Sequence, residues 1–159
     1  WPLLWDQLDY LSYFYLKRKV MSHLNKLNTK IYSLEELENQ VNAWKQAGEE
    51  VVFTNGCFDI VHRGHIEVLA SAADLGDKLV IGLNSDESIQ KLKGPNRPIL
   101  NEHSRTILLA SLSFVDAIIL FSEETPYNLI TTAAWDITYT YNIMNHALYC
   151  SHLQSINCA

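Results

Sequence analysis

The sequence predicts one α/β domain built around a small parallel β-sheet. An apolar stretch at residues 50–55, a glycine-containing turn and an apolar-periodic helix at 63–74 are followed by a second apolar stretch at 78–84. A strand, a helix and a strand in so short a span form a βαβ unit, whose strands lie parallel with a right-handed crossover. A third strand is expected at 115–121, and 159 residues suffice for one domain with a sizeable core.

The composition is that of an ordinary globular chain, with 48% hydrophobic and 19% charged residues. The net charge of −6 gives no indication of a nucleic-acid partner or an anionic membrane surface. The three cysteines, Cys57, Cys150 and Cys158, form no framework of disulfide pairs. We therefore expect a protein of the reducing cytoplasm.

Residues 1–20 are unusually aromatic and hold two of the four tryptophans. They lack a basic segment before the apolar part, and Asp6 and Asp9 interrupt it, so neither a signal peptide nor a membrane span fits. An amphipathic helix on a membrane surface is an alternative, although the basic residues gather at one end instead of along a face. Since Met21 opens an ordinary polar stretch, we expect the native protein to begin there and residues 1–20 to be a non-native or disordered leader.

The first clear helix is expected to run from residue 34 to about Ala47. Ser33 and Glu36 form a capping-box pattern, in which each side chain bonds the backbone N–H of the other residue. Gly48 is suited to end the helix. The apolar stripe, at spacings of three and four residues, comprises Leu34, Leu37, Val41 and Trp44.

Residues 51–65, VVFTNGCFDIVHRGH, give the strongest indication of function. The Asn55-Gly56 pair turns the chain after the strand, and His62 and His65 lie on either side of Gly64 where the next helix begins. Side chains three apart share a helix face, and a helix N-terminus adds free N–H groups and a positive dipole end. The combination predicts a binding site for a polyphosphate.

A zinc site and a pair of ordinary surface histidines are the alternative interpretations of His62 and His65. Zinc usually needs three or four ligands, and Cys57 is the one additional cysteine or histidine near the pair in the sequence. Short motifs also arise often by chance. The strand, turn and helix around the pair favour the phosphate site.

The second strand ends in Asn84, Ser85 and Asp86. Ligands of parallel sheets bind at the carboxyl ends of the strands, so these side chains are candidates for ligand contact. Ser85 or Asp86 is equally suited to capping the helix that follows.

The loop at residues 91–101, KLKGPNRPILN, is rich in basic residues although the protein is acidic overall. A solvated loop is the ordinary explanation of such a cluster. Next to a phosphate site, Lys91, Lys93 and Arg97 instead indicate a basic flap over the phosphates.

The elements that follow the loop are less informative. A helix is expected at 102–113, with Ile107, Leu108, Ser111 and Leu112 turned inward, and Pro126 fits the first turn of another. The buried face of the earlier helix at 63–74 is expected to comprise Ile66, Leu69, Ala70 and Ala73.

The segment TNGCFDIVHRGH (54–65) resembles the signature of the cytidylyltransferase-like nucleotidyltransferases, whose H-x-G-H motif falls on residues 62–65. Residues 75–99 and 104–130 further resemble the D-glycero-β-D-manno-heptose 1-phosphate adenylyltransferases. The resemblance implies a Rossmann-like three-layer nucleotidyltransferase fold. It also implies a reaction in which AMP passes from ATP to the sugar 1-phosphate, giving ADP-heptose and pyrophosphate.

The resemblance further implies roles for single residues. His62, His65 and Lys93 would stabilise the transition state and the departing pyrophosphate, and Mg²⁺ would bridge the phosphates without a ligand from the chain. Arg105 would assist beside the nucleotide, or else pair with Asp116 or another neighbouring carboxylate. The nucleotide-binding residues that the resemblance implies are Asn55, Gly56, Cys57, Phe58, Asp59, Gly64, Asn84, Asp86 and Arg105.

ATP and a sugar 1-phosphate are therefore the expected partners, with no nucleic acid and no membrane, and homodimers are common in the family. Asp59 is also suited to orienting neighbouring groups or capping the helix. The glycerol-3-phosphate cytidylyltransferases share the main motifs and are the alternative, although the KGPNRP segment (93–98) favours the heptose enzyme. That enzyme often occurs fused to a sugar kinase, and 159 residues point to a stand-alone version.

The resemblance is expected to end at Ile130, which gives a nucleotidyltransferase domain at 21–130 and an aberrant tail at 131–159. The tail has no glycine, lysine, arginine or glutamate, so we expect the fold to be incomplete at its C-terminal side, after a frameshift or truncation. Such a chain could be an inactive fragment. Residues 135–141 alternate like a makeshift strand, and the spacing of His146, Cys150, His152 and Cys158 matches no zinc pattern.

Overall fold

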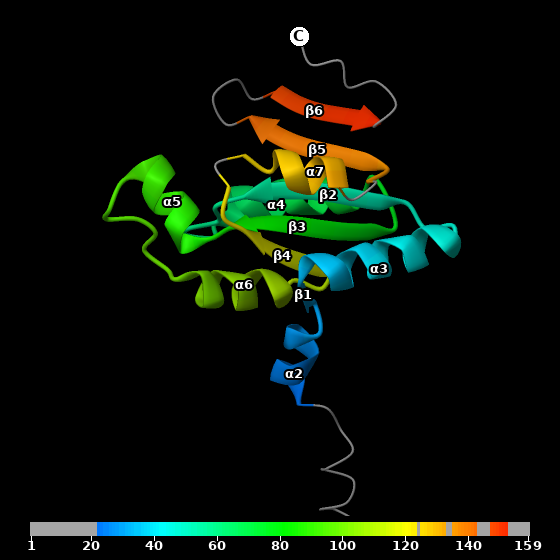
Figure 1. Cartoon of the computed structure of the whole chain (residues 1–159), viewed down its shortest axis with the longest axis horizontal. Coiled ribbons are helices and arrows are strands. Elements are labelled where there is room, and N and C mark those ends of the chain that lie inside the picture. Colours follow the sequence, from blue (N-terminus) through cyan, green and yellow to red (C-terminus); the bar gives the residue numbers. More distant parts are fainter. Residues whose placement is uncertain (1–21, 124, 133–134, 143–146, 153–159) are drawn as a thin grey trace, which may run out of the picture.

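A six-stranded β-sheet with helices on both faces forms the fold (Figure 1). The computed structural model describes residues 22–123, 125–132, 135–142 and 147–152. Its strands are β1 (Ile31–Tyr32), β2 (Val51–Gly56), β3 (Lys78–Asn84), β4 (Ala117–Phe121), β5 (Ile137–Asn142) and β6 (Ala147–His152). Its helices are α2 (His23–Asn28), α3 (Leu34–Gln46), α4 (Arg63–Ala73), α5 (Asp86–Lys93), α6 (Glu102–Ala110) and α7 (Tyr127–Thr132).

Five of these strands are parallel, in the spatial order β1-β4-β3-β2-β5, and β6 lies antiparallel beside β5. From β2 the chain moves outward through β3 to β4, and then crosses to the other side of β2 to form β5. The strand order therefore reverses beside β2, and ligands of such sheets bind outside the carboxyl ends of the strands at that point. The predicted Rossmann-like α/β class is confirmed.

The three predicted strands correspond to β2, β3 and β4, and β4 begins at Ala117, two residues later than expected. Strand β1 was not predicted, because a strand of two residues is too short to show an alternation of apolar and polar side chains. Strands β5 and β6 come from the segment 131–159, and β5 overlaps the alternating residues 135–141. Among the described residues this segment adds two strands to the sheet.

Apolar side chains form one core on each face of the sheet. On one face α4 and α6 pack through Leu69 and Leu109, which have no exposed surface. On the other face α3 and α7 cover the sheet, and Leu37 packs there with Trp135, whose ring stacks on Phe53 at 4.8 Å between centroids. None of the helices in the described ranges is long and apolar enough to cross a membrane.

Helix α3 has the predicted ends. Ser33 N donates to Glu36 Oε2 at 2.9 Å and Glu36 N donates to Ser33 Oγ at 3.4 Å, which completes the capping box. Gly48 follows the helix with φ of 82°, a conformation that favours glycine. Of the predicted stripe, Leu37 is buried, whereas Leu34 in the first turn is 45% exposed.

The predicted helix at 102–113 is wrong at its end and in its buried face. Helix α6 stops at Ala110, and Leu108, expected to face inward, is 45% exposed. The buried residues are Arg105, Thr106, Leu109 and Ala110. Apolar periodicity places arginine outward, but here the buried guanidinium of Arg105 sets the rotation of the helix.

Helices α4 and α7 agree better with the predictions. Helix α4 buries Leu69, while Ile66, Ala70 and Ala73 are half-buried. Helix α7 follows Pro126 directly, and Ile130 N donates to the Pro126 carbonyl at 2.8 Å.

Candidate active site

The histidine pair lies where β2 passes into α4, at the carboxyl edge of the sheet. His62 is the N-cap of α4 and His65 lies in its first turn. Their rings stack with 3.9 Å between centroids and 27° between planes. The pair therefore shares one helix end with N–H groups that have no partner within the helix.

Backbone hydrogen bonds fix both imidazoles. Gly64 N donates to His62 Nδ1 at 3.1 Å, and His62 N donates to His65 Nδ1 at 3.4 Å. Because Nδ1 is the acceptor in both rings, the neutral form of each carries its proton on Nε2. The His62 ring can therefore donate a hydrogen bond through Nε2 to an anionic oxygen, whereas the His65 ring also has a hydrogen bond to the backbone of Ile60.

His65 is held as a neutral imidazole. Partial burial is the main cause that lowers the pKa of His65 below its ordinary value of 6.5. The charges of His62 and Lys93 lower this pKa further, and the Ile60 carbonyl opposes them. A neutral His65 remains a hydrogen-bond donor at physiological pH.

Glycines and one strained residue bring the two rings into place. A Cβ on Gly64 would lie 3.1 Å from His62 Cε1, so glycine permits the close approach of that ring. Phe58 has φ of 44°, in the left-handed region that non-glycine residues seldom adopt. Its ring lies over Gly56 and meets His65 edge-on, with 5.3 Å between centroids. Backbone strain at Phe58 thus accompanies the support of His65.

Arg105 is a buried brace beneath the site, without exposed surface. Its Nη1 donates to the carbonyls of Cys57 at 2.7 Å and Asn84 at 2.8 Å. Its Nη2 donates to Asp86 Oδ1 at 2.6 Å, and its Nε donates to the Leu100 carbonyl at 3.0 Å. The side chain thereby ties the ends of β2 and β3 to the starts of α5 and α6. Contact between Arg105 and a nucleotide stays a prediction.

The start of α5 resolves the two alternatives for its cap. Ser85 Oγ accepts from Ser88 N at 3.1 Å, so Ser85 is the cap. Asp86 instead forms the ion pair with Arg105, which the sequence predicted with Asp116 or another neighbouring carboxylate. The predicted ion pair of Arg105 is therefore confirmed with a neighbouring carboxylate, Asp86 on α5, in place of Asp116.

The ends of β2 and β3 meet at Cys57 and Asn84. Cys57 Sγ lies 3.7 Å from Asn84 Oδ1, and Asn84 Nδ2 donates to Ser88 Oγ at 3.0 Å. Asn55 and Gly56 are the last residues of β2. The predicted nucleotide-binding residues of the two strands thus share one edge of the sheet.

Lys93 is the last residue of α5 and is exposed. Within the described part of the chain it has no hydrogen-bond or ion-pair partner, whereas Lys91 pairs with Glu87 at 2.7 Å. Burial, the charge of His62 and, as the last cause, the charge of Lys93 all lower the pKa of His65. Helix α5 and the loop after it project from one end of the sheet (Figure 1).

Asp59 binds the loop at residues 94–101. Arg97 Nη1 donates to Asp59 Oδ2 at 2.7 Å, and the N–H groups of Ile99 and Leu100 donate to Oδ1 at 2.6 and 3.3 Å. Burial raises the pKa of Asp59, but the hydrogen bonds from Arg97, Ile99 and Leu100 outweigh it and hold the pKa below its usual value. These contacts join the segment between β2 and the histidine pair to the loop at residues 94–101.

No group of three or more histidine, cysteine or carboxylate side chains in the described residues is arranged to hold a metal ion. Asp59 and Asp86, the carboxylates of the loops around the histidine pair, are each engaged by an arginine. Four residues of the tail were considered for a metal site. His146 and Cys158 lie outside the described residues, and the side chains of Cys150 and His152 are likewise not described.

An apolar groove of about 420 Å³ lies elsewhere, at the carboxyl end of β4. Its lining comprises Leu34, Ile119, Leu120, Phe121, Ser122, Glu123, Asn128 and Leu129. None of the predicted site residues lines it, and β3 separates β4 from β2. The groove is therefore distinct from the candidate site.

Sequence reasoning missed the partners of Asp59. Two of them are backbone N–H groups, which leave no signature in residue types. The third, Arg97, lies between two prolines of the loop at residues 94–101. Its positive charge alone indicated a phosphate ligand, whereas in the structure it pairs with Asp59.

A family model described as cytidylyltransferase-like matches residues 53–157, past Ile130, where the resemblance was expected to end. Among curated relatives, the bifunctional protein HldE of Helicobacter acinonychis is 54% identical over 114 residues, covering 72% of this chain and 24% of that protein. HldE of Methylobacillus flagellatus is 48% identical over 108 residues, covering 68% of this chain and 22% of that protein. This chain spans about a quarter of the length of these relatives.

A solved structure supports the same assignment. The lipopolysaccharide core biosynthesis protein from Thermoplasma volcanium aligns with a TM-score of 0.51 and 36% identity, over 57% of this chain and 73% of that one. The family match spans more than half of the chain and includes the histidine pair and the strands β3 to β6. The chain belongs to the cytidylyltransferase-like family.

Proposed function

We propose that this protein transfers AMP from ATP to D-glycero-β-D-manno-heptose 1-phosphate, giving ADP-heptose and pyrophosphate. The observation that carries the proposal is the stacked pair of His62 and His65 at the start of α4, with Nδ1 of both rings engaged by backbone N–H groups. The pair lies beside the strand at which the sheet order reverses. The lipopolysaccharide core protein and the HldE relatives support an acceptor of the heptose class.

The proposed reaction is an in-line displacement at the α-phosphorus of ATP. A phosphate oxygen of the sugar forms the new bond, the bond to the β-phosphate oxygen breaks, and pyrophosphate leaves. Such chemistry depends on positioning and on stabilising negative charge. His62 and His65 would donate through Nε2 to phosphate oxygens, and Lys93 would add a positive charge to the same oxygens.

Mg²⁺ would enter as part of the nucleotide substrate. Asp59 and Asp86 are already bound to Arg97 and Arg105, so phosphate oxygens and water would supply the ligands of the ion. When bound, Mg²⁺ neutralises charge on the phosphates. The chain itself would place the α-phosphorus against the helix N-terminus and exclude water from it. The nucleotide and the sugar phosphate are cytoplasmic metabolites, and we place the protein there.

The test is release of pyrophosphate by the whole chain in the presence of Mg²⁺. ATP and CTP are each combined with the heptose 1-phosphate and with glycerol 3-phosphate. Release with ATP and the heptose 1-phosphate alone is the expected result. Release with CTP and glycerol 3-phosphate would instead establish a glycerol-3-phosphate cytidylyltransferase, and silence in all four reactions from folded protein would indicate an inactive fragment.

A further inference from the structure

All the hydrogen bonds that Asp59 makes in the described structure go to the loop at residues 94–101. One comes from the Arg97 guanidinium and two from backbone N–H groups. The Asp59 side chain is 7% exposed, whereas that of Arg97 is 44% exposed. One partner is therefore fixed in the protein and the other belongs to an exposed segment.

A single tight turn connects this anchor to Lys93. Gly94 ends α5 with φ of 91°, and Arg97 N donates to the Gly94 carbonyl at 3.2 Å. Lys93 directly precedes that turn, so the position of Arg97 constrains where the end of α5 lies. Without the anchor, the last turn of α5 would be held at one end only.

The companion pair of Arg105 and Asp86 provides a contrast. Arg105 has no exposed surface and makes four hydrogen bonds, so its pair is a permanent part of the interior. Arg97 makes one side-chain hydrogen bond in the described structure and reaches solvent. The Arg97 pair is therefore suited to tuning the place of a surface segment, and it adds little to the core.

We propose that Asp59 and Arg97 form a latch that positions Lys93 beside the histidine pair. Asp59 is then a positioning residue that touches no substrate and acts through Lys93. The inference rests on the proposed nucleotidyl transfer, in which Lys93 binds phosphate oxygens. A displacement of about 1 Å in such a group lowers the rate about 100-fold, so a loosened latch has a measurable effect.

The kinetic test uses the single variants Arg97→Gln, Asp59→Asn and Lys93→Gln and the double variant Arg97→Gln/Lys93→Gln. Either latch variant is expected to lower kcat about 10- to 100-fold with little change in KM for ATP. If the latch acts through Lys93, the double variant is no slower than Lys93→Gln alone. Effects of the two substitutions that multiply in the double variant would overturn the proposal, as would an unchanged kcat in Arg97→Gln.

Glu67→Gln is the matched control. Glu67 also forms a 2.7 Å ion pair with an arginine, Arg63, but both side chains are exposed at 60% and 91%. The control loses one carboxylate on α4 without touching the loop at 94–101. Its kcat is expected to stay within about twofold of the parent protein.

Limited trypsin digestion tests the latch without any substrate. In the parent protein the latch should protect the bond after Lys93, and Arg97→Gln and Asp59→Asn should speed its cleavage at least fivefold, while Glu67→Gln should not. Urea unfolding of each variant separates local opening from global destabilisation. Equal cleavage rates in all variants would overturn the latch, whereas a latch seen in digestion with no activity in any protein would overturn the proposed function alone.

Discussion

Aspartates have different partners at the two ends of the parallel strands. We call the side where the strands begin the amino edge and the side where they end the carboxyl edge. At the amino edge an aspartate stands directly before each of β3, β4 and β5. Each forms two reciprocal hydrogen bonds with one residue in the neighbouring strand or directly before it. Its N–H donates to the carbonyl of that residue, and its carboxylate accepts the N–H of the same residue. The pairs are Asp77 with Glu50, Asp116 with Leu79 and Asp136 with Val51.

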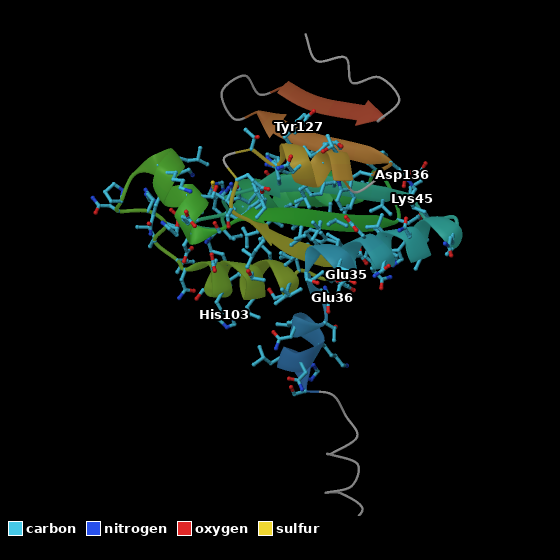
Figure 2. The ribbon with its side chains drawn as sticks, viewed as in Figure 1. Glu35, Glu36, Lys45, His103, Tyr127 and Asp136 are labelled. Carbon is cyan, nitrogen blue, oxygen red and sulfur yellow. The ribbon has the colours of Figure 1, made fainter. Side chains whose placement is uncertain are left out.

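Lysines complete the amino edge. Lys45 Nζ lies 2.9 Å from Asp136, and both side chains are labelled together in Figure 2. Lys78 lies 3.2 Å from Glu49 and 4.0 Å from Asp116. The charged side chains of this edge form ion pairs with one another and hydrogen bonds with backbone N–H groups.

At the carboxyl edge Asp59 and Asp86 are paired as well, but with arginines that hold loops. Those pairs leave Lys93 without a partner among the described residues, and Nε2 of His62 is available as a donor. The scaffold and the site therefore differ less in residue type than in which hydrogen-bond donors remain unused.

Arg105→Met should have the largest effect. It removes the guanidinium from beneath the site and leaves the carbonyls of Cys57 and Asn84 and the carboxylate of Asp86 without their partner. Loss of one member of a buried pair costs about 3–5 kcal/mol of the free energy of unfolding. Urea unfolding followed by circular dichroism measures it.

Arg63→Met is the control for Arg105→Met. Arg63 is 91% exposed in its pair with Glu67, so its removal should change stability by less than about 0.5 kcal/mol. Equal losses in the two variants would show that Arg105 is not the brace that the contacts describe.

His65→Ala should lower kcat about 100- to 1,000-fold, the usual effect of removing one donor to developing negative charge. The matched control is His103→Ala on α6, an exposed histidine visible in Figure 2. Its kcat should stay unchanged. Pyrophosphate release under saturating ATP is the measurement, and a His65→Ala enzyme with full activity would remove the histidine pair from the mechanism.

The amino-acid pattern predicted the parts of the site that are local in sequence. His62, Gly64 and His65 lie within four residues, and the helix they begin is periodic. The burial of Arg105 was not predicted, because its carbonyl partners lie 48 and 21 residues away. Its burial depends on which strands become neighbours, and periodicity carries no such information.

The aspartates of the amino edge form a repeated pattern in the sequence. Aspartate followed by an apolar stretch recurs at Asp77, Asp116 and Asp136, and the third of these opens β5. Read as a repeat, it would have predicted a further parallel strand after residue 136, inside the segment expected to be aberrant. The two-residue β1 has no comparable signal, because its pairing is decided by β4.

Asp136→Ala should lower the free energy of unfolding by about 1–3 kcal/mol and leave kcat within twofold. Val51 has no exposed surface, so its N–H finds no water when the carboxylate is removed. Asp77→Ala is the comparison, because its partner Glu50 is exposed and water can replace the carboxylate. We expect the Asp77 variant to lose less stability than the Asp136 variant, and the reverse order would contradict the role of burial at this edge.

The smallest expected effect is a dependence of stability on pH that arises at His65. Its pKa in the folded protein lies below the value of 6.5 that it has in the unfolded chain, mainly because of burial. Between the two pKa values the unfolded chain binds more protons, so the contribution of His65 is complete above pH 6.5 and is lost as the pH falls through the folded pKa. Urea midpoints from pH 7.5 to 5 should therefore fall more steeply in the parent protein than in His65→Gln. A parent slope retained in His65→Gln would assign the pH dependence to other groups.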